Sequence, residues 1–118
     1  MCTAVRIAVA ADTRERRLEL RRAAVTAEWE VVAEADSPEG AYGETIERRA
    51  RFLVLDASAA GPRPETIVRR LKSVAPLTFV IGVGEVAGTD ANLPASDLSG
   101  LRETIRTLLH DGGDHTHG

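Results

Sequence analysis

The fold is decided by the stretch Phe52-Leu53-Val54-Leu55-Asp56. Four apolar residues in a row, after an arginine-rich flank and before a small-residue loop, are typical of a strand buried on both faces of a parallel sheet. The strand ends on an acid, and open parallel sheets bind their ligands beyond the carboxyl ends of the strands. Asp56 is therefore the first candidate functional residue. The alternative is that its carboxylate only caps the loop that follows.

Strand and helix patterns alternate on both sides of this stretch. Apolar runs or period-two alternation predict three more strands, at 5–11, 29–35 and 79–83. Apolar residues at helical spacing predict four helices, at 14–25, 38–49, 65–74 and 96–112. These elements predict a three-layer α/β sandwich whose central core comes from Ile7, Val9, Leu53, Leu55, Val80 and Ile81.

The helices carry more detailed expectations. We expect Ile46 and Val74 to face the sheet. We interpret the arginines of 14–25, Arg16 among them, as a solvated helix face. The alternative is that these arginines dock an acidic partner. The last helix should begin at a cap on Ser96 or Asp97 and end at Gly112-Gly113.

Composition limits the possible classes of protein. The chain has 118 residues, 43% hydrophobic and 28% charged, which predicts one domain at 1–110 and a disordered tail at 111–118. A net charge of −3 gives no electrostatic case for binding nucleic acid. The lone Cys2 excludes a disulfide framework. No apolar run has the length of a membrane helix or the pattern of a signal peptide. We therefore expect a cytoplasmic protein that does not bind a membrane.

The segment 84–94 does not fit the alternation. It has no helical periodicity and is too short for a crossover helix followed by a strand, so one element is missing and the fifth strand is the least defined.

Five stretches together resemble the receiver domain of bacterial response regulators in order and spacing, over roughly residues 4–110: 5–12, 30–35 with Gly40-Ala41, 52–56, 71–76 and 80–81. The resemblance implies a CheY-like, flavodoxin-like fold, with a doubly wound, parallel five-stranded sheet in the order 2-1-3-4-5 and the fourth helix shortened or missing. It also implies that Asp56 is the phosphoacceptor and that Asp12 is one of the acidic magnesium ligands.

The chain departs from the receiver pattern at the residues that carry its chemistry. Ala11 replaces the first of two adjacent acids, and Gly84 replaces the switch Thr or Ser. The lysine position falls on Leu93, or on Pro94 if the register slips by one, so the ammonium is absent. Of the Met-Pro-Gly-like run after the phosphoacceptor, only the glycine of Ala59-Ala60-Gly61 is kept.

These losses weaken phosphoryl transfer, which depends on positioning and on cations that neutralise the transferred oxygens. Asp12 and Asp56 could still bind Mg²⁺ weakly, because that ion can be held by one or two carboxylates. We therefore interpret the chain as an atypical receiver, or pseudo-receiver, in signal transduction or transcriptional regulation. It would not be an enzyme, and it would contact a sensor kinase, a regulatory protein or a second copy.

Two other classes stay open. One is a stand-alone receiver that is switched by phosphorylation of Asp56. The other is a flavodoxin-like domain that binds a small molecule in a crevice left by the shortened segment 84–93 over the third and fourth strands. A hydrolase is disfavoured, because no histidine lies near a strand end and Ser58 has no evident base.

A missing fourth helix also predicts an interaction surface. It should expose the apolar side of strand 79–83, and such patches are usually binding sites. We expect Gly84, Leu93, Leu98 and Leu101 to lie on this surface, which would form a homodimer or bind a partner. The alternative is that the short segment folds over the sheet and leaves a monomer.

Overall fold

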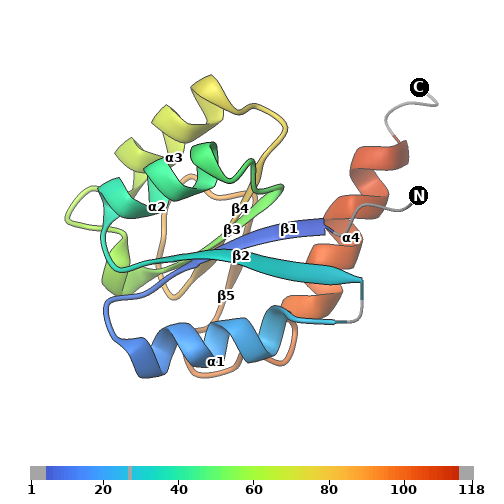
Figure 1. The fold of residues 1–118 in the computed structure, drawn as a ribbon, viewed down its shortest axis with the longest axis horizontal. Helices are drawn as coiled ribbons and strands as arrows, with labels where there is room; N and C mark the ends of the chain where they lie inside the picture. Colours follow the sequence, from blue (N-terminus) through green and yellow to red (C-terminus); the bar gives the residue numbers. More distant parts are fainter. Residues whose placement is uncertain (1–4, 27, 115–118) are drawn as a thin grey trace.

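A computed structural model describes residues 5–26 and 28–114, with side chains for those up to residue 110. This part of the chain forms a five-stranded sheet between two layers of helices (Figure 1). The strands are β1 (Val5–Ala10), β2 (Trp29–Ala35), β3 (Phe52–Asp56), β4 (Phe79–Val83) and β5 (Ala91–Leu93). The helices are α1 (Arg14–Ala24), α2 (Pro38–Glu47), α3 (Pro64–Val74) and α4 (Leu101–Asp114), with a 3₁₀ turn, η1 (Ala57–Ala59), after β3.

The sheet is parallel throughout, in the order β2-β1-β3-β4-β5. β3 lies in the middle and all of its residues are buried. Helices cover both faces of such a sheet, which is why its central strand is a continuous apolar run. The predicted sandwich, strand order and central strand are confirmed, and none of the six predicted core residues is more than 1% exposed.

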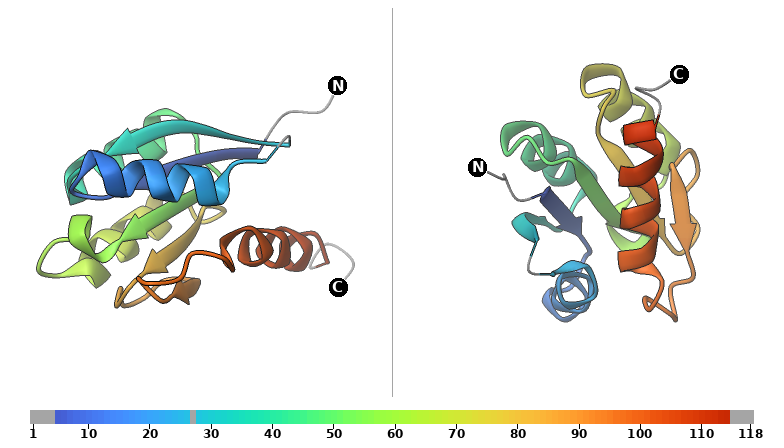
Figure 2. Two further views of the ribbon diagram at one scale, coloured as in Figure 1. Left: turned by 90° about the horizontal axis from the view of Figure 1, so that it is seen from below. Right: turned by 90° about the vertical axis from the view of Figure 1, so that its right-hand side faces the viewer.

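Each face of the sheet packs against two helices (Figure 2). α1 and α4 cover one face and bury Leu20, Ala24, Leu101 and Ile105 against it. α2 and α3 cover the other face and bury Ala41, Ile67, Val68 and Leu71. Side chains alternate along a strand, so β3 directs Phe52 and Val54 toward α1 and α4, and Leu53 and Leu55 toward α2 and α3.

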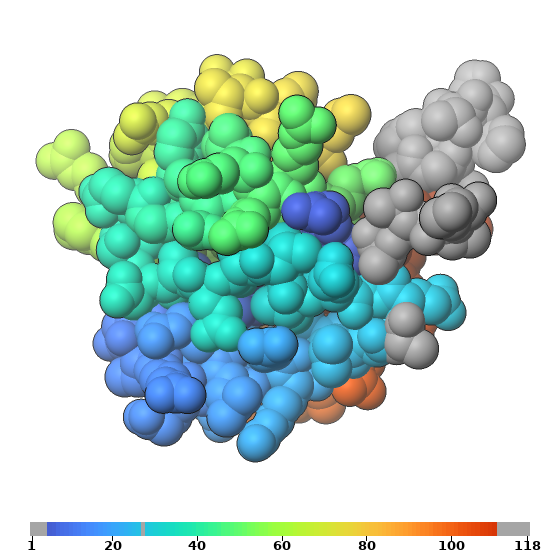
Figure 3. All heavy atoms as spheres, viewed as in Figure 1, coloured from blue at the N-terminus to red at the C-terminus, as the bar shows by residue number. Residues whose placement is uncertain are grey.

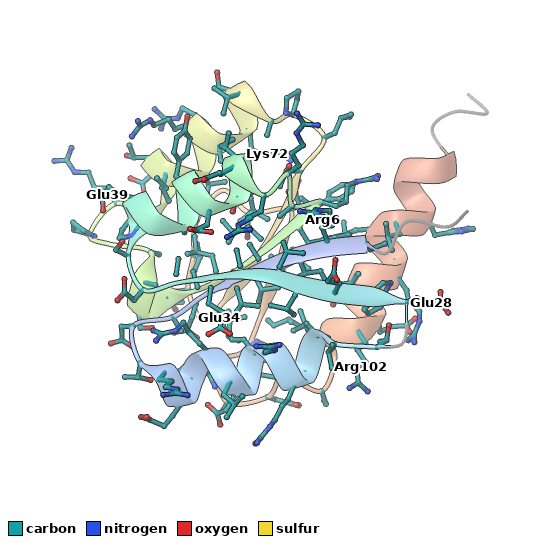
Figure 4. The ribbon with its side chains drawn as sticks, in the orientation of Figure 1. Arg6, Glu28, Glu34, Glu39, Lys72 and Arg102 are labelled. Atoms are coloured by element: carbon teal, nitrogen blue, oxygen red, sulfur yellow. The ribbon has the colours of Figure 1, made fainter. Side chains whose placement is uncertain are left out.

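β2 forms one edge of the sheet and lies across the front of the molecule between α1 and α2 (Figure 3). Its Glu34 points toward α1 (Figure 4) and forms ion pairs with Arg17, over 3.5 Å, and Arg21, over 3.2 Å. Charged side chains on an edge strand disfavour pairing with another chain.

No helix joins β4 to β5, so the prediction that the fourth helix is missing is confirmed. Residues 84–90 instead cross the α2–α3 face as an irregular segment, in which Val86 is buried with Val68 and Val80. Asp90 fixes the end of the segment. Its Oδ2 accepts hydrogen bonds from the backbone N–H of Val80, over 2.7 Å, and from Nζ of Lys72, over 3.0 Å.

The missing helix does not expose β4, which corrects the expectation of a bare apolar strand. Residues 80–83 are buried, and a Cβ added at Gly82 would lie 2.8 Å from Cβ of Val86. Because residue 82 has no side chain, the crossover lies directly on the strand. The crevice that the small-molecule alternative requires over β3 and β4 is therefore filled.

The ends of α4 differ from the prediction. The helix begins at Leu101, because Oδ1 of Asp97 accepts a 3.0 Å hydrogen bond from the N–H of Ser99 in a separate turn before it. It continues through Gly112-Gly113 to Asp114. Glycine weakens a helix by about 1 kcal/mol but does not forbid helical backbone angles. Residues 115–118 of the expected tail lie outside the described residues.

Two side chains expected to face the sheet are exposed instead. Ile46 is 37% exposed and Val74 is 56% exposed. In α2 the buried positions are Ala41 and Thr45, four residues apart, so Ile46 lies to one side of the buried stripe. In the described ranges, no helix is long and apolar enough to span a membrane.

Candidate functional site

The carboxylate of Asp56 lies at the carboxyl end of β3, on the side of the sheet that α1 covers. Strand alternation places it there, because Phe52 and Val54 point the same way. Its Oδ2 accepts hydrogen bonds from the backbone N–H of Ser58, over 3.1 Å, and from Oγ of Ser58, over 2.5 Å. Asp56 therefore does cap the loop after β3, and this role occupies one of its two oxygens.

The other oxygen of Asp56 is bound by Arg16. Nε of Arg16 donates a 3.0 Å hydrogen bond to Oδ1, and the two side chains are only 21% and 9% exposed. The same guanidinium donates to the carbonyl of Ala95, over 2.6 Å, and to Glu19, over 3.2 Å. Partial burial acts to lower the pKa of Arg16, but the hydrogen bonds to Asp56 and Glu19 outweigh it and raise that pKa. Arg16 is thus a permanent cation at this carboxylate.

Arg16 also corrects the interpretation of the α1 arginines as a solvated face. Its neighbour Arg17 is equally withdrawn from solvent and donates a 2.9 Å hydrogen bond to the carbonyl of Ala11. Arg21 and Arg22 are exposed, as expected. The missed signal was present in the sequence, because Arg16 and Arg17 precede the buried Leu20 by four and three residues and so share its helix face.

The residues implied for a magnesium site fit that ion poorly. Asp12 is exposed, and its backbone N–H donates a 3.2 Å hydrogen bond to Oγ of Ser58. Ala11 beside it is fully buried in the core. Among the side chains described for residues 5–26 and 28–110, no three of His, Cys, Asp or Glu gather in an arrangement that could hold a metal. An ion at Asp56 would share the two carboxylate oxygens with the guanidinium of Arg16 and with Ser58.

Gly84 is the residue that the resemblance aligns with the switch Thr or Ser of receivers. Its φ is +88°, in the left-handed region that favours glycine. A Cβ added there would lie 3.1 Å from Cβ of Ala57 and 3.6 Å from Cβ of Ala95. Gly84 lacks a hydroxyl, and the local backbone also disfavours replacing it by Ser or Thr.

Leu93, which with Pro94 is one of the two residues that the resemblance aligns with the receiver lysine, is the last residue of β5. Its carbonyl accepts a 2.8 Å hydrogen bond from the N–H of Gly84, and its side chain packs at the margin of the α1–α4 core. In the described part of the chain, the cation that reaches Asp56 is therefore the guanidinium of Arg16.

The residues predicted for an interaction surface do not all lie on one. Leu101 is fully buried in the core, because the first turn of α4 faces the sheet, so its assignment to a surface is wrong. Leu98 is partly exposed and lines an open groove of about 420 Å³ between α1 and α4. The groove is also lined by Ala23 and by three charged residues: Glu19, Arg22 and Arg102. Gly84 and Leu93 do not line it.

Several solved structures share this architecture. The REC domain of AraT, a response regulator from Geobacillus stearothermophilus, has a TM-score of 0.77 at 20% identity, covering 97% of this chain and 99% of that one. A LuxR-family response regulator from Aurantimonas sp. SI85-9A1 has a TM-score of 0.78 at 21% identity, covering 92% and 87%. The response regulator domain of Thermotoga maritima CheB has a TM-score of 0.75 at 17% identity, covering 92% and 98%.

No protein-family model and no curated protein matches the sequence. The structural likeness extends over most of the chain, and it establishes the fold at these low identities. The chain has the CheY-like fold of a response-regulator receiver domain.

Proposed function

We propose that the chain is an atypical receiver domain that acts in the cytoplasm, in signal transduction or transcriptional regulation, by binding another protein. It works without efficient phosphorylation and catalyses no reaction of its own. The fold supports a signalling role, because the solved structures that share it are response regulators. The observation that carries the atypical assignment is the contact between Arg16 and Asp56.

This contact disfavours phosphorylation for two reasons. Attack on a phosphoryl donor needs a free carboxylate oxygen and cations arranged around the transferred group. Both oxygens of Asp56 are already engaged, one by Ser58 and one by Arg16. In addition, Gly84 and Leu93 offer no hydroxyl or ammonium to a phosphoryl group. A phosphorylated form would therefore gain few contacts that could favour a second conformation.

The groove beside Leu98 is the surface we propose for the protein partner, which is a second copy of the chain or a regulatory protein. Its lining combines the apolar Leu98 and Ala23 with Arg22 and Arg102, a combination found in protein interfaces. Arg16 binds the carbonyl of Ala95, three residues before Leu98. The site at Asp56 and the proposed surface are thus linked through a single side chain.

A receiver switched at Asp56 is the second candidate. The hydroxyl of Ser58 accepts a hydrogen bond from the backbone N–H of Asp12 and donates one to Oδ2 of Asp56. The backbone of Asp12 and the carboxylate of Asp56, the two acids that the resemblance assigns to phosphorylation, therefore meet at one serine.

Incubation with acetyl phosphate and Mg²⁺, followed by intact mass spectrometry, separates the two functions. We expect the wild-type chain to gain no more phosphoryl groups than the Asp56→Asn variant, and its affinity for Mg²⁺ to be on the order of millimolar or weaker. Stoichiometric and stable phosphorylation of the wild type, abolished by Asp56→Asn, would establish the phosphorylated receiver instead.

A further inference from the structure

A second surface lies at the opposite end of the sheet from Asp56. The loops before β3 and β4 meet there with the carboxyl-terminal ends of α2 and α3, and they enclose an open hollow of about 310 Å³. We call this surface the amino-end patch and define it by the hollow's lining residues Ile46, Arg49, Arg51, Val74 and Leu77. In Figure 3 the green end of α2 and the yellow end of α3 adjoin at the upper edge of the molecule.

The patch concentrates the exposed apolar side chains of the domain. Of the five large apolar side chains exposed in the described ranges, three lie here: Ile46, Val74 and Leu77. Leu77 is 80% exposed, the highest fraction among the five. Single exposed apolar residues need no explanation, but several around one hollow mark an interaction site.

The patch is also basic, although the chain has a net charge of −3. Arg49 and Arg51 line the hollow, and neither forms an ion pair with a described residue. Arg6 reaches the same end of the sheet, where its Nε donates a 2.8 Å hydrogen bond to the carbonyl of Arg48 (Figure 4). The nearby acids are Glu44, which pairs with Arg48 over 3.5 Å, and the exposed Glu47.

The backbone at Arg49 ends α2. Its φ is +53°, and it is the one residue other than glycine with a positive φ in the described part of the chain. The N–H of Arg49 donates a 3.2 Å hydrogen bond to the carbonyl of Ile46, and the N–H of Ala50 donates a 3.0 Å hydrogen bond to the carbonyl of Thr45. These two bonds form the Schellman arrangement, which ends a helix on a residue with positive φ and here leaves the exposed side chain of Arg49 lining the hollow.

We propose that the amino-end patch binds an acidic amphipathic peptide segment of another protein. The apolar side chains of the segment enter the hollow beside Leu77 and Val74, and its carboxylates pair with Arg49 and Arg51. A second copy of the chain fits less well, because a two-fold contact would bring two copies of the same basic patch together. The patch is separate from the groove at Leu98, so this proposal does not depend on the role of that groove.

Selection from a phage library of random helix-length peptides tests the proposal, with the purified chain as the target. The affinity of the enriched peptides for the wild-type chain is then compared with their affinity for three variants: Leu77→Ser, Arg49→Gln/Arg51→Gln and, as a control, Leu18→Ser. Leu18 is exposed but lines neither the hollow nor the groove at Leu98. We expect the enriched sequences to combine Asp or Glu with large apolar residues. We also expect both patch variants to weaken binding by about tenfold or more, and Leu18→Ser to leave it unchanged.

Other outcomes would overturn the proposal: no enrichment, enriched peptides without an excess of acids, or equal binding to the patch variants. A dimer of the wild-type chain that dissociates in Leu77→Ser would also overturn it, by assigning the patch to a second copy. Leu77 is exposed, so we expect its variant to fold, and urea unfolding followed through the single, buried Trp29 checks this.

Discussion

Arg16 and Asp56 are 40 positions apart in the sequence, and Nε of Arg16 donates a 3.0 Å hydrogen bond to Oδ1 of Asp56. Through the carbonyl of Ala95, the same guanidinium also holds the loop between β5 and α4. One side chain therefore joins α1, β3 and the segment that leads to Leu98. The positive charge that a phosphorylation site would take from a metal ion is supplied here by the chain itself.

Removing the cation should destabilise the protein. We expect Arg16→Met to lower the free energy of unfolding by about 1–2 kcal/mol, because among the described residues it leaves the largely buried carboxylate of Asp56 with hydrogen bonds from Ser58 alone. Urea unfolding followed by Trp29 fluorescence measures the change.

Arg14→Met is the matched control for this variant. Arg14 lies on the same helix, is exposed, and forms no ion pair with a described residue. Its replacement should change stability by less than about 0.5 kcal/mol. Equal effects of the two substitutions would contradict the structural importance of the contact with Asp56.

Restoring a hydroxyl at residue 84 should not restore a switch. We expect Gly84→Ala and Gly84→Thr each to cost about 1–3 kcal/mol, because both place a Cβ on a backbone with φ of +88° and close to Ala57. Gly43→Ala is the control, since a Cβ there meets nothing within 4 Å and alanine favours the helix by about 1 kcal/mol. In thermal unfolding, we expect a lower midpoint temperature for both Gly84 variants and a higher one for Gly43→Ala. An unchanged midpoint for Gly84→Ala would contradict the predicted backbone strain.

The turn before α4 should respond to acid. Hydrogen bonds from the side chain and the backbone N–H of Ser99 lower the pKa of Asp97. Because the pKa of Asp97 is lowered in the folded state, these bonds stabilise the turn at pH values above 3.8, the ordinary pKa of the group. This stabilisation is lost as the pH falls through the folded-state pKa. An NMR titration should place the midpoint of Asp97 below 3.8, and Ser99→Ala should raise it. A wild-type midpoint at or above 3.8 would contradict this account.

The groove between α1 and α4 should mediate self-association. Sedimentation velocity at tens of micromolar should give a mass above that of the monomer, and Leu98→Glu should reduce it to the monomer value. Leu18→Glu is the control, because Leu18 is also an exposed leucine, on α1, but does not line the groove. A wild-type chain that stays monomeric would exclude the homodimer and leave only a different protein as partner.

The fold could be predicted from sequence because local patterns determine most of it. The continuous apolar run of β3 and the absence of a helix after β4 are each visible within a few residues. Strand order followed from the resemblance, since local patterns do not determine which strands pair. The exposed positions of Ile46 and Val74 were missed, because helical spacing alone does not show how a helix is rotated on the sheet.

The candidate site was predicted in part. Asp12, Asp56 and Gly84 lie at or just after the ends of predicted strands. Strand periodicity therefore places all three at the carboxyl end of the sheet. The contact of Arg16 with Asp56 was missed because it joins residues far apart in sequence, and an arginine at a helix start usually points to solvent. The burial of Leu101 was missed because the helix was expected to begin at Ser96 or Asp97.

The central claim is that Asp56 is held by Arg16 and does not act as a phosphorylation switch. Its most direct test is the backbone amide NMR spectrum of the wild-type chain before and after addition of Mg²⁺ and beryllofluoride, a mimic of the phosphoryl group. The account predicts that the amide signals of Asp56, Ser58 and Ala95 stay in place. Saturable shifts at these residues that extend to Leu98 and are absent in Asp56→Asn would contradict it.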